Sequence, residues 1–141
     1  MKRYRNQKGA ALLEAAITVP IILLISVGIF EFGRAYQTWQ VLTNAAREGA
    51  RIAVLEGTTD ADIRTTVNNY LKGGGLKTLA DSDIPIARAV TLTPSSTAST
   101  VGINYPFEFM VLNPIVRLIA PTDTKTGAPI TMKAATLMRN E

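Results

Sequence analysis

The stretch "AALLEAAITVPIILLISVGIF", residues 10–30, decides how the rest of the chain is read. Its 21 residues include a single ionisable group, Glu14. A helix of this length spans about 30 Å, the thickness of the hydrocarbon core of a bilayer. Buried helices of soluble domains are usually shorter and have a polar face, whereas this segment is apolar on all sides. The sequence therefore predicts a transmembrane helix over residues 10–30, with a bend at Pro20.

The basic residues before this segment predict its orientation. Lys2, Arg3, Arg5 and Lys8 all precede Gly9, and no acidic residue does. By the positive-inside rule, residues 1–9 form a cytoplasmic leader and residues 31–141 an exported domain. Removing the four leader cations leaves 11 basic against 11 acidic residues, so the remainder is formally neutral. A neutral domain lacks the basic surface that phosphate binding needs, so no nucleic-acid partner is expected.

Two other topologies are open at this point. A cleavable secretory signal has an apolar core of about 7–15 residues followed by a small-x-small cleavage site. The run here is longer, and the nearest small pair, Ser26 and Gly28, lies near its end. The second alternative is an unprocessed, single-span anchor that carries an exported interaction domain.

The helix is predicted to continue to about residue 56, because no proline or turn cluster occurs before Gly57. Apolar residues recur there at steps of three or four, which is typical of an amphipathic helix. They are Phe32, Tyr36, Trp39, Leu42, Ala46, Ala50, Ala53 and Val54. Tyr36 and Trp39 suit either a membrane interface or a soluble core. Small residues allow a helix or sheet to approach closely, within the chain or from another subunit. This small-residue patch consists of Ala45, Ala46, Gly49, Ala50 and Ala53.

A short second helix is predicted within residues 58–75. Thr59 can cap it, Asp60 and Asp62 suit its first turn, and Gly73 to Gly75 end it. One face of this helix is expected to be apolar. Its members are Ile63, Val67, Tyr70 and Leu71.

Beyond residue 83 the period changes to two, which predicts strands. The best match is "STVGINYPFEF", residues 99–109, where Pro106 indicates an edge or a strand end. "IPIARAVTLT" (84–93) and "APITMKAATLMRN" (128–140) are predicted as further strands, and "TPSSTAST" (93–100) as a polar hairpin loop. Residues 110–121 suit a short helix or a buried strand, and a helix is favoured. The predicted fold is a single α+β unit whose three-stranded antiparallel sheet packs on the C-terminal half of the long helix.

Residues for catalysis or cofactor binding are not evident. The chain has no cysteine and no histidine, which removes thiol nucleophiles, histidine bases and the usual zinc ligands. "GGGLKT" at 73–78 has Leu76 where a phosphate-binding loop requires glycine. The pairs Asp60/Asp62 and Asp81/Asp83 lack the pattern of a calcium loop. An enzyme, a metal site, a cofactor and a small-molecule substrate are therefore not expected.

The N-terminal third of the chain resembles TadE-type pseudopilins, the minor pilin-like proteins of tight-adherence (Flp/Tad) pilus systems. The resemblance covers residues 8–51. It includes the glycine before the apolar run, the glutamate five residues later, the central proline, "EFGRA" and "NAAREGAR". The C-terminal "ATLMRNE" is also similar to the closing strand of that family. The resemblance implies a pilin-like fold and a structural subunit that assembles through its N-terminal helix.

The family's processing and assembly residues can be transferred to this chain. Gly9 would be the last residue before the cut made by a prepilin peptidase, Ala10 the mature N-terminus, and Glu14 the assembly glutamate. Where many members have an aromatic residue after that glutamate, this chain has Ala15. The implied partners are other pilins or pseudopilins, the prepilin peptidase and the inner-membrane assembly platform. The implied location is the inner membrane, with the C-terminal domain outside the cytoplasm.

The position of Glu14 within the apolar run has an energetic cost in a membrane. A carboxylate in hydrocarbon costs on the order of 3 kcal/mol by insertion scales. Cleavage after Gly9 would create an α-ammonium on Ala10, and the ammonium of an adjacent, staggered subunit would offset that cost. The alternative is that Glu14 reaches the headgroups or pairs with Lys8 of its own chain.

Overall fold

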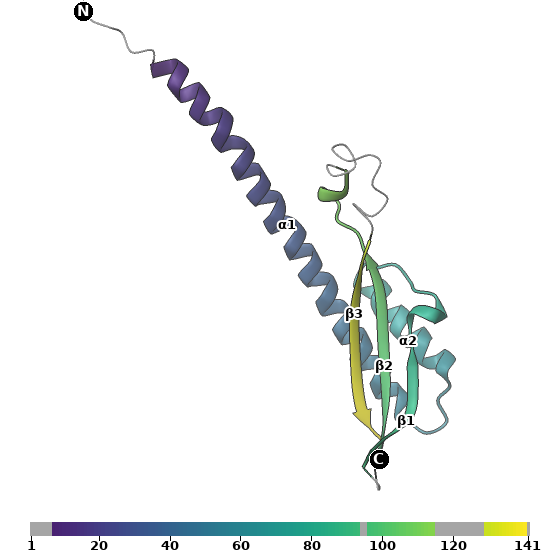
Figure 1. Ribbon diagram of the computed structural model, residues 1–141. Helices are drawn as coiled ribbons and strands as arrows, with labels where there is room; N and C mark the ends of the chain where they lie inside the picture. Colours follow the sequence, from purple (N-terminus) through teal and green to yellow (C-terminus); the bar gives the residue numbers. More distant parts are fainter. Residues whose placement is uncertain (1–6, 94–95, 115–128, 141) are drawn as a thin grey trace, which may run out of the picture.

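The computed structural model describes residues 7–93, 96–114 and 129–140. Its longest element is α1 (Gln7–Ala53), a helix of 47 residues that continues through Pro20. The N-terminal part of α1 projects away from the other elements, which gather around its C-terminal part (Figure 1). The helix ends at Ala53, slightly before the predicted end. The turn that follows contains Gly57 at φ +79°, a conformation that glycine adopts without strain.

The second helix, α2 (Asp60–Gly73), has the predicted boundaries, and its N-terminus explains why. The Thr59 hydroxyl accepts a hydrogen bond from the Asp62 backbone N–H, and the Asp62 carboxylate accepts one from the Thr59 N–H. This capping box satisfies two donors that would otherwise lack partners. The predicted apolar face was wrong at Tyr70, which is exposed. Ile63, Val67 and Leu71 form the side of α2 that is buried in the core, and Tyr70 lies outside it.

A three-stranded antiparallel sheet follows, in the order β1-β2-β3. Its strands are β1 (Ile86–Thr93), β2 (Ser96–Phe107) and β3 (Ile130–Arg139), and a short 3-10 helix, η1 (Asp81–Asp83), precedes β1. The predicted polar loop over residues 93–100 was too long, since residues 96–100 belong to β2. Ser96 and Thr97 pair with β1, and Ala98 and Thr100 pair with both β1 and β3, so the backbone is hydrogen-bonded here despite polar side chains.

Pro106 occupies a part of β2 that has a neighbour on one side only. The β1 side of β2 is paired as far as Gly102, which donates its N–H to the carbonyl of Pro85. Beyond that point β2 pairs only with β3, and Pro106 lies opposite Thr131. Because backbone groups alternate along a strand, position 106 faces the open side, where a missing N–H does no harm. In the segment predicted as a helix, residues 112–114 are helical, and residues 115–121 lie outside the described part of the chain.

The core lies between the helices and one face of the sheet. The C-terminal part of α1 packs against β2 and β3, and α2 packs against α1. The alternating residues Val101, Ile103, Tyr105 and Phe107 of β2 supply the buried face of the sheet. The α+β fold and the position of the sheet agree with the prediction.

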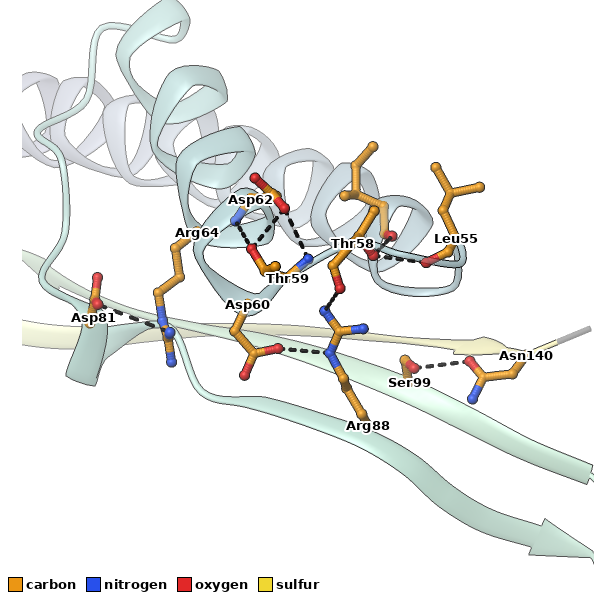
Figure 2. A network of polar contacts seen from close by, with 11 residues as sticks. Leu55, Thr58, Thr59, Asp60, Asp62, Arg64, Asp81, Arg88, Ser99 and Asn140 are labelled. Carbon is orange, nitrogen blue, oxygen red and sulfur yellow. Dashed lines mark hydrogen bonds and ion pairs between the residues drawn. The ribbon is translucent and has the colours of Figure 1, made fainter.

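Polar contacts connect α2 to the sheet (Figure 2). Arg88 of β1 pairs with Asp60 at 2.7 Å and donates to the carbonyl of Thr58 at 2.9 Å. Asp81 lies 4.0 Å from Arg64. Three of the four carboxylates considered as cation ligands thus serve in a cap or an ion pair. Within the described residues, no cluster of acidic side chains is suited to hold a metal ion.

Candidate functional site

In the part of the chain that the structure describes, the most apolar stretch of α1 is not buried against the folded domain. This stretch is long and apolar enough to cross a membrane. Its large apolar side chains are exposed. They include Leu12, Leu13, Ile17, Val19, Ile21, Ile22, Leu23, Leu24 and Ile25. A surface of this size is not stable in water, so it requires lipid or other helices around it.

Gly9 and Ala10 lie inside the first turns of α1, and both are exposed. Gly9 is therefore not a joint that precedes the helix. A protease that cuts after Gly9 would have to unwind this end. The first turn of a helix frays readily, and a glycine there lowers the cost of unwinding by about 1 kcal/mol relative to alanine.

Glu14 lies on the exposed surface of α1 and forms no ion pair with any described side chain. It follows Ala10 by four residues, about 6 Å along the helix axis. The alternative partner, the Lys8 side chain, lies outside what the structure describes. The carboxylate is thus available to a group supplied from outside the fold.

The small-residue patch has the opposite environment. Ala45, Ala46, Gly49 and Ala50 are buried, and Ala53 nearly so. A Cβ atom on Gly49 would lie 2.6 Å from Val67 Cγ2 and 3.1 Å from Val101 Cγ1. The patch therefore brings α1 against both α2 and β2 within one chain.

The predicted amphipathic stripe was wrong over its first half. Phe32 is 74% exposed, and Tyr36 and Trp39 are also exposed. The buried stripe instead passes through Glu31, Ala35, Thr38 and Leu42, which follow one another at helical steps of three or four residues. Ala35 is half-buried, and the other three are buried. The predicted stripe and the buried one both follow the helical period and meet at Leu42, so the period alone does not distinguish them.

Glu31 is the buried polar residue that the sequence analysis missed. Only 1% of it is exposed, although it directly follows the apolar run. Its Oε1 accepts the backbone N–H of Val111 at 2.5 Å, and its Oε2 lies 3.4 Å from Arg34 Nη2. Burial raises the pKa of Glu31. Hydrogen bonds from the backbone of Val111 and Leu112, together with the charge of Arg34, lower the pKa by more than burial raises it. The net pKa lies below the ordinary value, so the carboxylate is ionised at neutral pH.

Arg34 completes this junction. It donates to the carbonyl of Glu108, and its guanidinium lies 4.7 Å from the centre of the Phe107 ring, a cation–π distance. Together Glu31 and Arg34 attach the chain after β2 to α1 at the point where the apolar run ends. We refer to these two residues and their contacts as the Glu31–Arg34 junction.

A groove of about 740 Å³ lies beside this junction. It is bordered by α1, the segment after α2 and the end of β2. Its charged lining residues are Arg34, Lys77, Asp83 and Glu108. The mixture of both signs favours no particular ligand charge, and the lining includes no nucleophile with an adjacent base.

Comparison with known proteins supports the resemblance in the N-terminal region. The family model described as TadE-like protein matches residues 9–51. No curated protein and no solved structure matches the chain. The match covers the exposed apolar half of α1, Glu31 and Arg34 themselves and most of the small-residue patch, and it ends before α2 and the sheet.

Proposed function

Since its N-terminal region is TadE-like, we propose that this protein is a minor pilin-like subunit of a tight-adherence pilus. A prepilin peptidase removes residues 1–9 by cutting after Gly9. The processed subunit then assembles through the N-terminal half of α1. Its partners are other pilins or pseudopilins and the inner-membrane assembly platform. Before assembly it spans the inner membrane once, with the leader in the cytoplasm and the sheet domain outside.

One observation carries this proposal. An unburied, membrane-length stretch of α1 contains a single carboxylate, and that carboxylate is the fifth residue after Gly9. A helix that serves only as an anchor gains nothing from Glu14, because a charge in hydrocarbon opposes insertion. A helix that must recognise neighbours does gain, because the charge favours only those arrangements that bring a cation to it.

The cation is supplied by processing. Cleavage leaves an α-ammonium on Ala10, at the edge of the apolar run. When a second subunit is displaced along its axis by about one helical turn, roughly 6 Å, its ammonium reaches the height of Glu14. The ion pair then offsets much of the cost of the carboxylate in lipid, which is on the order of 3 kcal/mol. Assembly in the correct register is favoured over isolated subunits.

The test of processing is the intact mass of the protein purified from its native host. A mature chain that begins at Ala10 supports the proposal. An uncut chain contradicts it and supports the alternative, an unprocessed anchor with an exported interaction domain. A chain that begins near Ile29 identifies a secreted protein. Gly9→Leu should remain uncut, whereas Gly9→Ala should be cut at least in part, because the peptidase must approach the backbone closely there.

The test of the carboxylate is Glu14→Leu. We expect this variant to insert in the membrane as well as the wild type, and to reduce pilus formation at least about tenfold, since 1.4 kcal/mol of lost pairing corresponds to that factor. Glu56→Leu is the matched control, because Glu56 is exposed in the turn after α1, far from the apolar run. Normal piliation by Glu14→Leu would contradict the assembly role.

A further inference from the structure

The segment that follows β2 lies beside the residue of α1 at which the apolar run ends. Val111 donates its backbone N–H to Glu31, the first residue after the run, and Arg34 holds the carbonyl of Glu108. These contacts fix the position of the segment along the axis of α1. The short helical turn that ends the segment, drawn in green, points toward the N-terminal half of α1 (Figure 1).

This segment is apolar where it turns away from the sheet. Residues 109–112 are Phe, Met, Val and Leu, and we refer to them as the Phe109–Leu112 loop. Met110 is 61% exposed, so its side chain has no partner that accounts for it within the described fold. On α1, the neighbouring Ile29, Phe30 and Phe32 are exposed as well. Apolar surface from two separate parts of the chain thus occurs at one height.

We propose that the Phe109–Leu112 loop is a second membrane contact, which enters the lipid interface beside α1. The inference rests on the proposed insertion of residues 10–30. Given that insertion, Glu31 lies at the boundary of the hydrocarbon core, and a loop hydrogen-bonded to Glu31 lies there too. Apolar side chains at such a boundary are buried about 5–10 Å into the headgroup and acyl region. The occupant is therefore lipid, because the height of the loop is set by the membrane helix itself.

The Glu31–Arg34 junction is consistent with this position. A free carboxylate next to the hydrocarbon would oppose insertion. Glu31 avoids this cost because it is enclosed by the loop, accepts backbone N–H groups and pairs with Arg34. The carboxylate thus attaches the loop to α1 and does not face the lipid.

Two points of attachment have a mechanical consequence. A single helix can tilt and rotate in the bilayer, and a domain joined to it alone would follow those motions. A loop in the interface on one side of α1 restricts both motions. The sheet domain then has a defined orientation when a neighbouring subunit approaches.

Because the chain has no cysteine, a thiol-reactive fluorophore labels a single-cysteine variant only at the introduced position. Three full-length variants carry an environment-sensitive fluorophore: Met110→Cys in the loop, Leu24→Cys in the apolar run and Leu55→Cys in the turn after α1. All three wild-type side chains are exposed, so no substitution removes a core residue. Each variant is reconstituted in phosphatidylcholine/phosphatidylglycerol vesicles, with and without lipid that carries a nitroxide quencher near its carbonyl groups.

We expect strong quenching at Leu24→Cys, quenching at Met110→Cys about twofold or more above that at Leu55→Cys, and little at Leu55→Cys. Quenching at position 24 with none at 110 would overturn the loop contact and leave the membrane helix intact. No quenching at either position would overturn the membrane placement, and the loop contact with it. If the fluorophore at position 110 is shielded from water but is not quenched by the labelled lipid, a second protein subunit covers the loop. This result also overturns the proposal.

Discussion

The two halves of α1 belong to one continuous helix but have opposite surroundings. From Gly9 to Ile25 the helix exposes large aliphatic side chains, whereas from Ala45 to Ala53 the side chains that it buries are small. In soluble proteins the large apolar residues are the ones expected inside. Here the large ones face outward, on a stretch that is long and apolar enough to span a membrane. The small ones are inside because they allow α2 and β2 to reach the helix backbone.

The comparison shows that apolar composition alone does not identify a core. Apolar residues of the first half follow one another without a polar face, while those of the second half recur with the helical period. Glu31 and Arg34 lie where the continuous apolar run ends and the half with a helical period begins. There the chain after β2 is hydrogen-bonded to α1 through a buried carboxylate.

The largest expected effect separates the halves by truncation. Leu42→Ala should lower the free energy of unfolding of the sheet domain by about 2–5 kcal/mol, since it leaves a cavity at a fully buried position. Leu24→Ala should change it by less than about 0.5 kcal/mol, because Leu24 touches none of the domain. Chemical denaturation in detergent, followed by the fluorescence of Trp39, measures both. Equal effects would show that the N-terminal half packs on the domain.

A smaller effect is expected from added volume at two glycines of the same helix. Gly49→Leu should destabilise the domain by about 1–3 kcal/mol or more, because even a Cβ there would lie 2.6 Å from Val67. Gly33→Leu is the matched control, since no atom lies within 4 Å of its Cβ position. Thermal unfolding by circular dichroism compares the two. A tolerated Gly49→Leu would contradict the close approach of α1 to α2.

The smallest effect concerns the Glu31–Arg34 junction and depends on pH. Glu31→Gln should destabilise the domain by about 1–3 kcal/mol at neutral pH, because hydrogen bonds to a charged group are lost. The folded-state pKa of Glu31 lies below its unfolded value, so its stabilising effect is complete above the unfolded pKa, about 4.3. The effect is lost as pH falls through the folded-state pKa. The difference between wild type and variant should therefore be constant from pH 7 to about pH 5 and shrink in more acidic solution. A difference that grows on acidification would contradict the ionised, paired carboxylate.

Much of this fold could be predicted from particular residues. Thr59 and Asp62 predicted the start of α2, and the alternation from Val101 to Phe107 predicted the buried face of β2. Both are local signals, in which the residues that set the structure are neighbours in sequence. The polar side chains of residues 96–100 predicted a loop, yet these residues extend β2, where Ala98 and Thr100 pair with the preceding strand β1 and also with β3, which is distant in sequence.

The candidate site divides in the same way. Gly9, Ala10, Glu14 and Pro20 are identified by their order along one helix, and their proposed roles need no knowledge of the domain. Glu31 could not be assigned in this manner, because its partner Val111 is 80 residues away. A charged side chain is expected to be exposed unless it has partners, and the partners of Glu31 are the Val111 N–H and Arg34.

The sequence by itself determined the membrane-length helix and the class of fold, because hydropathy and local period depend only on residues close together along the chain. Only the tertiary structure decided which face of α1 is buried, and it placed a carboxylate there while leaving three aromatic side chains outside. Burial of a polar group depends on whether distant backbone and side-chain atoms satisfy its hydrogen bonds, and that follows from how the sheet and the helix meet.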